Sequence, residues 1–302
     1  MTAYVIYLLS GKNILCLTLK VGTVKRYIAA VAKLFTDQDV LNPTINKHGA
    51  ESEYLTGVFK EAQRWESIPN RAEAMSLDMV QSLLDKSKSS HPDSSSAAIA
   101  DWIILGSYAG FRMSEFGQSR SSLVLPVNPT AAITTNIDGS AKAFIFDDFS
   151  FYTSRRIRID VGSISDTSIL DSADIRYRFQ KNNDNGQIVT FSRNKDCPQL
   201  CPVMAMYRIC LRAQRLHLDP QLPLSVYTYV KNKKPCLVYI TSRLVDREIK
   251  WAAKHAHSIT SSKDLSKFIP HSIRVGACAL LFAAGKKADY IKQRLCWRSD
   301  AY

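Results

Sequence analysis

The chain has 302 residues, of which 46% are hydrophobic and 22% charged, a composition typical of a globular protein with room for two domains and a sizeable core. Its 40 Lys and Arg residues outnumber its 27 Asp and Glu residues, which gives a net charge of +13. This excess favours a polyanionic partner, nucleic acid before a membrane surface, although a basic protein without such a partner has the same composition.

The seven cysteines are scattered, and the close pair Cys197 and Cys201 lacks the second Cys or His pair of a zinc site. We therefore expect free thiols in a reducing compartment. The apolar run of residues 3–9 has neither a basic region before it nor a clear cleavage site after it, so it predicts a buried helix and not a signal peptide. No stretch is long enough to span a membrane. The sequence predicts an intracellular protein, nuclear in a eukaryote and cytoplasmic in a prokaryote.

Residues 1–67 are predicted to be helical. Thr23 is a candidate N-cap for one helix, and a second helix is expected from about Glu51. The predicted core faces of these helices comprise Tyr27, Ile28, Val31, Leu34 and Phe35, and then Tyr54, Leu55, Val58, Phe59 and Ala62. Basic residues on the outer faces either contact DNA phosphates or form an ordinary solvated face. These candidates are Lys20, Lys25, Arg26, Lys33, Lys60 and Arg64. Residues 68–75, which include Pro69, are predicted to be a linker.

Ser76 is predicted to cap a helix that ends before a polar surface loop over residues 86–96. The apolar run of residues 97–109 predicts a central helix that is buried on most sides. Gly110 permits a bend after this helix. Arg112 and Glu115 follow at a spacing of three, which on its own is usually an ordinary helical ion pair.

From about residue 120 to residue 195 the hydrophobic pattern has a period of two. Strands are predicted over residues 143–146 and 156–160, and a β-hairpin is predicted from residues 174–180, an Asn/Asp/Gly-rich turn and residues 187–191. Lys181 lies where the first strand of the hairpin enters the turn, and a lysine there is ordinarily solvated. A further strand is predicted over residues 236–240.

The C-terminal part predicts helices over residues 202–216, 242–257, 271–284 and 287–295. Pro270 suits the first turn of the third of these. His271 and Arg274 then share one face near its N-terminus, where free N–H groups and the helix dipole favour a phosphate. Trp297 can contribute an indole N–H. Together these residues predict a compact clamp for an anion.

Three separated elements resemble, in their order and surroundings, the tyrosine recombinase (phage-type integrase) superfamily. They are the Gly-Phe-Arg-Met-Ser-Glu run of residues 110–115, Lys181 on a hairpin, and His271-x-x-Arg274 followed by Trp297. The resemblance covers nearly the whole chain, and residues 179–186 are similar to integrase-like proteins of mobile elements. The resemblance implies a mainly α fold with a small antiparallel β-sheet. Residues 1–67 would form a helical core-binding (SAM-like) DNA-binding domain and residues 68–75 a linker. Residues 76–302 would form an α+β catalytic domain that is incomplete at its C-terminal end.

The resemblance also implies a role for each residue of the site. Arg112 and Arg274 bind the non-bridging oxygens of the scissile phosphate, and His271 and Trp297 donate to the same group. Lys181 protonates the departing 5′ hydroxyl. Fixed cations and donors of this kind stabilise a phosphoryl-transfer transition state without a metal, so neither a metal nor another cofactor is expected.

Two further residues complete the set that the resemblance implies. Glu115 supports the arginine pocket. The tyrosine nucleophile is expected a few residues beyond Tyr302, and Tyr302 is the alternative nucleophile, although it lies close to Trp297.

The activity implied by the resemblance is site-specific DNA recombination or integration through a 3′-phosphotyrosyl intermediate, carried out by a homotetramer on double-stranded DNA. The chain as it stands is expected to lack the nucleophile for this reaction. The alternatives are a DNA-binding protein that derives from such an enzyme and no longer cleaves, and a basic helical protein whose motif matches are accidental.

Overall fold

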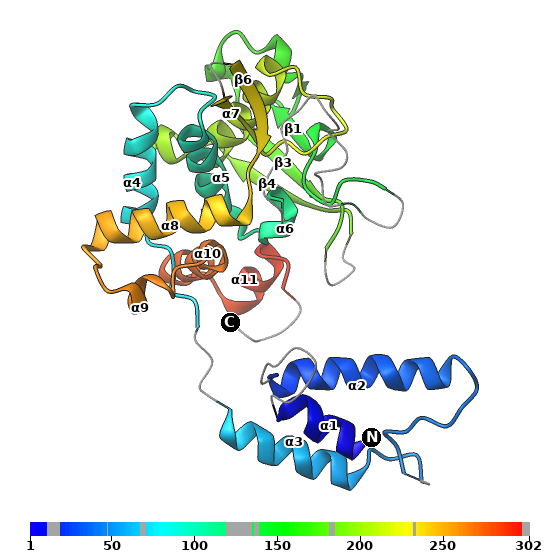
Figure 1. Cartoon of the computed structure of the whole chain (residues 1–302). Helices are drawn as coiled ribbons and strands as arrows, with labels where there is room; N and C mark the ends of the chain where they lie inside the picture. The colour runs from blue at the N-terminus through cyan, green and yellow to red at the C-terminus, as the bar shows by residue number, and fades with distance from the viewer. Residues whose placement is uncertain are drawn as a thin grey trace. The chain divides into compact units, whose positions relative to one another are not determined.

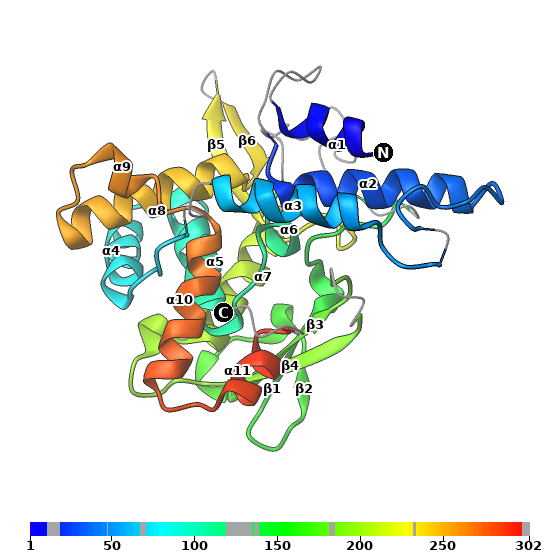
Figure 2. The same cartoon turned by 90° about the horizontal axis from the view of Figure 1, so that it is seen from below.

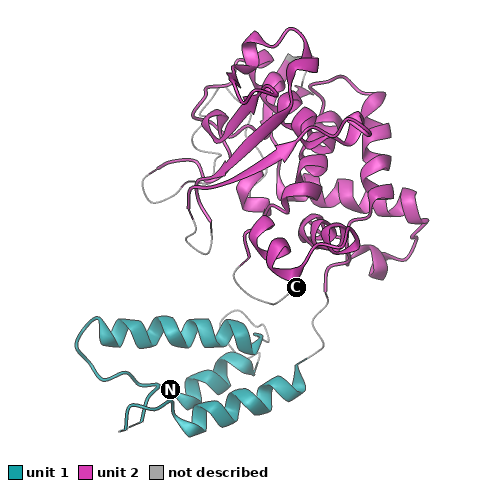
Figure 3. Ribbon diagram, turned by 180° about the vertical axis from the view of Figure 1, so that it is seen from behind, with its two compact units in different colours: residues 1–70 teal, residues 71–302 magenta. Residues whose placement is uncertain are grey.

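The computed structural model of the protein describes residues 1–10, 19–46, 48–66, 71–118, 135, 139–180, 185–231 and 234–297. The chain forms two compact units, residues 1–70 (unit 1) and 71–302 (unit 2), shown in Figures 1 and 3. The fold is mainly α with a small antiparallel sheet, which confirms the predicted fold class. Among the described residues, no helix combines the length and the apolar character that crossing a membrane requires.

Unit 1 is built from helices around a small apolar core. They are α1 (Thr2–Leu9), α2 (Val21–Thr36) and α3 (Glu53–Trp65). Their shared core contains Val5, Leu8, Val21, Val24, Ile28, Leu55 and Phe59.

The predicted start and core face of α2 were partly wrong. The helix begins at Val21 with Lys20 as its N-cap, so Thr23 lies inside the first turn. The sequence offers two apolar stripes, and the stripe buried in unit 1 begins with Val21 and Val24. Of the residues predicted for the two core faces, Ile28, Leu55 and Phe59 are buried. Tyr27, Leu34, Phe35 and Tyr54 are exposed.

Unit 2 is built from one buried helix surrounded by other helices and two sheets. Its longer helices are α4 (Leu77–Lys88), α5 (Ser95–Ala109), α7 (Pro202–Arg215), α8 (Ser242–His257), α10 (His271–Ala283) and α11 (Ala288–Arg294), and its short ones are α6 (Met113–Phe116) and α9 (Ser262–Leu265). Single 3₁₀ turns occur at Phe146–Asp148, Val161–Ser163, Thr167–Ile169 and Pro198–Leu200. Ser76 caps α4, as predicted, by accepting the Met79 backbone N–H, although α4 extends two residues past Lys86 into the predicted loop.

Helix α5 is the centre of unit 2, as its composition predicted. It packs against α4, α7 and α10. Nearly all of its residues are buried, including Trp102, whose indole stacks on the ring of Phe116. The helix ends at Gly110, which has a left-handed conformation (φ 59°). This end of α5 leads directly into the residues of the candidate site.

The main sheet has four strands in the order β2-β1-β3-β4, all antiparallel. They are β1 (Phe149–Tyr152), β2 (Arg158–Ile159), β3 (Ser172–Tyr177) and β4 (Gln187–Ser192). The predicted hairpin is confirmed as β3–β4, with Tyr177 paired to Gln187 next to its turn. A separate two-stranded sheet comprises β5 (Val226–Lys231) and β6 (Lys234–Tyr239).

The strand predicted over residues 143–146 was wrong. Ala143, Phe144 and Ile145 are all buried, but they pair with none of the strands of the main sheet. Two of their backbone N–H groups donate elsewhere: the Phe144 N–H to the carbonyl of Glu115 in α6 (2.9 Å), and the Ile145 N–H to the carboxylate of Asp148 in the following 3₁₀ turn (2.9 Å). The segment therefore connects α6 to the sheet without joining it.

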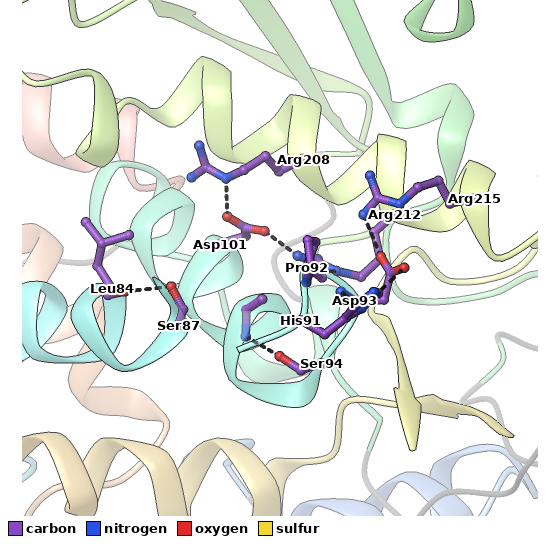
Figure 4. A network of polar contacts seen from close by, with 11 residues as sticks. Leu84, Ser87, His91, Pro92, Asp93, Ser94, Asp101, Arg208, Arg212 and Arg215 are labelled. Atoms are coloured by element: carbon purple, nitrogen blue, oxygen red, sulfur yellow. Dashed lines mark hydrogen bonds and ion pairs between the residues drawn. The ribbon is translucent and has the colours of Figure 1, made fainter. Parts of the chain in front are cut away.

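A buried network of charges joins α5 to α7 (Figure 4). Asp101 of α5 accepts from Arg208 Nε (2.6 Å) and from Arg212 Nη2 (2.5 Å) of α7. Arg212 also donates to the Pro92 carbonyl (3.0 Å), and Arg215 pairs with Asp93 (2.5 Å). Asp101 and Arg212 are both almost fully buried, so each supplies the counter-charge that water cannot supply to the other.

We expect Asp101→Ala to destabilise unit 2 by about 3–5 kcal/mol, because the variant leaves the Arg212 guanidinium buried without its counter-charge. Chemical denaturation followed by circular dichroism measures the loss. The matched control is Asp85→Ala, which removes an exposed carboxylate paired with Lys88 and is expected to leave stability nearly unchanged. Equal midpoints for the two variants would contradict the role of the buried network.

Candidate functional site

Arg112 and Glu115 form a closed unit at the start of α6. The backbone N–H of Arg112 donates to Glu115 Oε2 (2.7 Å), and its Nη1 donates to Glu115 Oε1 (2.9 Å). Both carboxylate oxygens thus serve one arginine. Glu115 is only 5% exposed, so the pair is unlike the solvated helical ion pair that the spacing alone suggested. Burial raises the pKa of Glu115, and the hydrogen bonds and charge of Arg112 oppose that rise.

Arg274 lies on the first turn of α10 and is fixed by two carbonyl groups from distant parts of unit 2. Its Nη1 donates to the carbonyl of Gly110 (2.6 Å), and its Nη2 donates to the carbonyl of Leu295 (2.8 Å). The guanidinium also lies 4.9 Å from the centre of the Trp297 ring, a cation–π distance. Arg274 therefore joins the end of α5, the end of α11 and Trp297 at one point.

The surroundings of Arg274 make it an unusually placed cation. Its burial first, and then the positive charge of Arg112, lower its pKa to about 10, while Glu115 acts in the opposite direction. The guanidinium still carries its charge at neutral pH. An anion bound beside Arg274 would relieve its repulsion from Arg112.

His271 is the first residue of α10, and it reaches the protein surface while part of its imidazole is covered. Partial burial lowers its pKa, and the positive charges of Arg274 and Arg112 lower it further. The imidazole is thus within electrostatic reach of both arginines. The structure brings together four of the residues predicted from the sequence, Arg112, Glu115, His271 and Arg274, with Trp297 stacked against the last of them.

Two residues of this region, Tyr177 and Cys296, gave no signal in the sequence, and the role of a third, Gly110, was predicted only in part. The hydroxyl of the buried Tyr177 donates to the Ala109 carbonyl (3.2 Å), and Glu115 and Cys296 help burial to raise its pKa. Cys296 has a positive φ of 54°, and burial raises its pKa to about 11. Gly110 was predicted only as a bend, but a side chain there would also meet Leu295 at 2.6 Å. Only tertiary contacts reveal these roles.

The β3–β4 hairpin is attached to α11, and Figure 2 shows β4 beside that helix. Gln187 Nε2 donates to the Gln293 carbonyl (3.2 Å), and Arg294 Nη1 donates to the Thr190 carbonyl (2.7 Å). Arg294 also lies 4.2 Å from the centre of the Phe191 ring. Lys181 and Tyr302 lie outside the described residues, whereas the base of the hairpin that carries Lys181 is fixed to the segment that carries Trp297.

The predicted DNA-contacting residues belong to unit 1. Lys20, Lys25, Arg26, Lys33, Lys60 and Arg64 are all exposed. Arg64 pairs with Glu61 (2.9 Å), and the ammonium of Lys25 lies 5.1 Å from the centre of the Phe59 ring. Neither contact buries the charge, so both side chains remain at the surface.

Within the described ranges, no group of three or more His, Cys, Asp or Glu side chains has the arrangement of a metal site. The polar groups that converge at α10 are mainly donors and cations. Guanidinium groups, a protonated imidazole and an indole N–H all donate hydrogen bonds, which suits an oxyanion. The arrangement can therefore bind a phosphate ester and stabilise charge that develops on its oxygens.

Comparisons with solved structures identify the fold. The integrase of the Tn1549 transposon, solved in complex with transposon right-end DNA, is 12% identical, with a TM-score of 0.50 over 99% of this chain and 76% of that one. The XerH site-specific recombinase bound to its difH substrate is also 12% identical, with a TM-score of 0.45 over 93% of this chain and 60% of that one. The sequence itself matches no protein-family model and no curated protein. The likeness to the Tn1549 integrase is one of fold, and this fold is consistent with a tyrosine recombinase catalytic domain.

We expect sulfate to bind this site more tightly as the pH falls from 8 to 5. Sulfate is a dianion throughout that range, and its charge favours the imidazolium of His271, whose pKa is lowered in the free protein. Binding therefore takes up a proton, and affinity rises as the pH falls through the pKa of the complex and levels off below that of the free protein. The gain is about tenfold for each pKa unit by which sulfate raises the pKa of His271.

The indole N–H signal of Trp297 in NMR titrations reports this binding. The control variant His271→Gln retains the arginines and is expected to bind sulfate with an affinity that does not change over the same pH range. A parallel pH dependence in the wild type and the variant would show that another group takes up the proton.

Proposed function

We propose that the protein binds double-stranded DNA and that its α10 site holds a DNA phosphodiester for strand cleavage and rejoining, as in tyrosine-type site-specific recombinases and integrases. The observation that carries the proposal is the convergence of cations at the start of α10: Arg274, one turn from His271, lies over the Trp297 ring and donates to the carbonyl of Gly110, two residues before Arg112. The fold supports it, because the Tn1549 integrase was solved with DNA. That integrase belongs to a transposon, so DNA integration by a mobile element is the form of recombination that we propose.

The chemistry of the proposed site follows from its donors. Arg112 and Arg274 neutralise the non-bridging oxygens, and their planar guanidinium groups match two oxygens at once. Arg274 uses two of its N–H groups on carbonyls, which leaves the others for the phosphate. His271 donates to the same oxygens, and its lowered pKa makes it neutral enough at pH 7 to accept a proton as well.

Two steps of the proposed reaction depend on residues outside the described ranges. We propose Lys181 as the general acid that protonates the departing 5′ hydroxyl. An ammonium near two guanidinium groups loses its proton more readily, which suits this role. The nucleophile is a tyrosine whose attack forms a 3′-phosphotyrosyl bond, and Tyr302 is the candidate that experiment can test directly.

The charge of the chain is concentrated where the proposal needs it. Residues 201–302 contain 18 Lys and Arg residues against six Asp and Glu residues, which accounts for +12 of the net charge of +13. A long polyanion gains affinity from such an excess of positive charge through release of its counterions. The same proposal divides the chain into a core-binding domain (residues 1–67), a linker (68–75) and a catalytic domain (76–302). The core-binding domain contacts DNA through Lys20, Lys25, Arg26, Lys60 and Arg64. Strand exchange requires a homotetramer.

The second candidate function is DNA binding without cleavage, by a protein derived from a recombinase. The same phosphate clamp favours it, because binding needs only the arginines, whereas cleavage needs a positioned tyrosine as well. The two functions therefore share an affinity for DNA and differ in one covalent step.

We expect duplex DNA to bind with an affinity that falls steeply with salt, with a slope of about −0.9 in log K against log salt concentration for each phosphate neutralised. Fluorescence anisotropy at several salt concentrations measures the slope. Replacing both Lys25 and Arg26 by Ala is expected to flatten it by up to about 2 units, and replacing Asp37 by Ala, an exposed residue in the same unit, is expected to leave it unchanged. A salt-insensitive affinity would exclude both DNA-binding functions.

We expect a DNA substrate with a nick beside the cleavage site to trap a covalent protein–DNA adduct if the chain cleaves DNA. Denaturing gel electrophoresis detects the adduct. Arg274→Lys is expected to lower the rate of adduct formation by a factor of about 10²–10³. An ammonium cannot both donate to the Gly110 and Leu295 carbonyls and direct further N–H groups at the phosphate, as the planar guanidinium can. Loss of the adduct in Tyr302→Phe would identify Tyr302 as the nucleophile. Tight DNA binding without any adduct would establish the second function instead.

A further inference from the structure

Residues 71–76, which we call the strap, connect unit 1 to α4 and lie against the start of α10. The Glu73 N–H donates to the Lys267 carbonyl (3.1 Å), and the Met75 N–H donates to the Ser272 carbonyl (3.1 Å). The Met75 side chain is 3% exposed and belongs to the main core of unit 2. The strap is thus held by its backbone and by one buried side chain.

Gly276 of α10 is the residue against which the backbone of the strap packs. A Cβ atom at this position would lie 2.4 Å from the Met75 carbonyl oxygen and 3.0 Å from the Met75 nitrogen. These are backbone atoms, which cannot rotate away as the end of a side chain can. The backbones of the strap and of α10 approach each other so closely only because residue 276 has no side chain.

The strap contacts α10 within the turn that carries the candidate site. Ser272, which accepts the Met75 N–H, lies between His271 and Arg274 and is fully buried. Its hydroxyl accepts the Ile269 N–H (3.1 Å), which fixes the segment that enters the helix. A shift of the strap therefore moves the backbone to which both site residues are attached.

Both ends of the strap are fixed. At its start, the Lys267 ammonium lies 3.9 Å from the Glu73 carboxylate. At its end, Ser76 caps α4, and its hydroxyl is 2.8 Å from Nε2 of His257 on α8. On its other face α10 packs against α5, where the Ile273 side chain reaches Gly106. Helix α10 is consequently held between α5 and the strap.

We propose that the strap is a positioning element for the candidate site, and that Gly276 is the positioning residue on which it is seated. The strap sets how far the first turn of α10 lies from Arg112, and so sets the geometry of the clamp formed by His271 and both arginines. The expected effect on DNA cleavage rests on the proposed function, whereas the expected effect on the position of the first turn of α10 does not.

The test compares Gly276→Ala with Gly57→Ala in the full-length chain. Both substitutions add one methyl group to a helical glycine, but no atom lies within 4 Å of a Cβ at Gly57. In Gly276→Ala we expect amide hydrogen exchange at Met75 to accelerate about tenfold or more. We also expect the pKa of His271, followed by NMR, to rise towards the ordinary histidine value as the imidazole becomes more exposed to water and moves away from Arg112. Gly57→Ala is expected to change neither quantity.

The effect on DNA separates positioning from general stability. We expect Gly276→Ala to bind duplex DNA within about threefold of the wild type, because most of the affinity comes from charges elsewhere. Formation of the covalent adduct is expected to slow by about 10²-fold, the usual cost of misplacing a reacting group by about 1 Å. If Gly276→Ala does not fold, Glu73→Pro removes one strap hydrogen bond at an exposed position and is expected to shift both NMR quantities in the same direction.

An unchanged His271 pKa and unchanged Met75 exchange in a folded Gly276→Ala protein would overturn the proposal. If the wild type forms no adduct, the proposed cleavage function fails, while the two NMR measurements still decide whether the strap positions the site.

Discussion

The buried guanidinium of Arg274 is the group on which the arrangement of this site depends. A permanent charge can remain in the interior only if its N–H groups are satisfied, and here the carbonyls of Gly110 and Leu295 satisfy two of them. Those carbonyls belong to the end of α5 and the end of α11. One side chain therefore fixes the mutual position of three helices, and the same contacts fix the direction of its remaining donors. The stability of unit 2 and the geometry of the site thus depend on the same hydrogen bonds.

The site also shows how a buried carboxylate can orient an arginine while the site as a whole keeps its positive charge. Glu115 receives both the backbone N–H and Nη1 of Arg112, so the arginine is oriented from two points. Burial disfavours the ionised carboxylate, whereas the nearby arginines favour it. The cluster of Arg112, Arg274 and one carboxylate keeps a net positive charge, which an incoming phosphate can compensate. A second carboxylate at this place would have closed the site as a salt bridge.

The sequence predicted the helices of unit 2 well, because strong periodicity and clear capping residues mark them: α8 was predicted at its observed bounds, and Ser76 caps α4 as expected. It failed where burial is decided by partners far along the chain. Tyr27 and Phe35 fit a helical apolar stripe but are exposed, because α1 and α3 cover the other stripe. The site followed the same rule. His271 and Arg274 were predictable from local spacing, whereas Cys296 and Tyr177 reach Glu115 only through the fold.

Gly276 illustrates why such contacts cannot be read from local sequence. Within α10 it is simply a poor helix former, and nothing nearby requires it. Its function is defined by Met75, which lies about two hundred positions earlier and is brought against it by the backbone bond to Ser272. A glycine that weakens a helix is tolerated when the close approach that it permits adds backbone hydrogen bonds between elements. In this protein the approach fixes the one helical turn on which His271 and Arg274 both lie, so the cost in helix stability is offset where the chemistry needs rigidity.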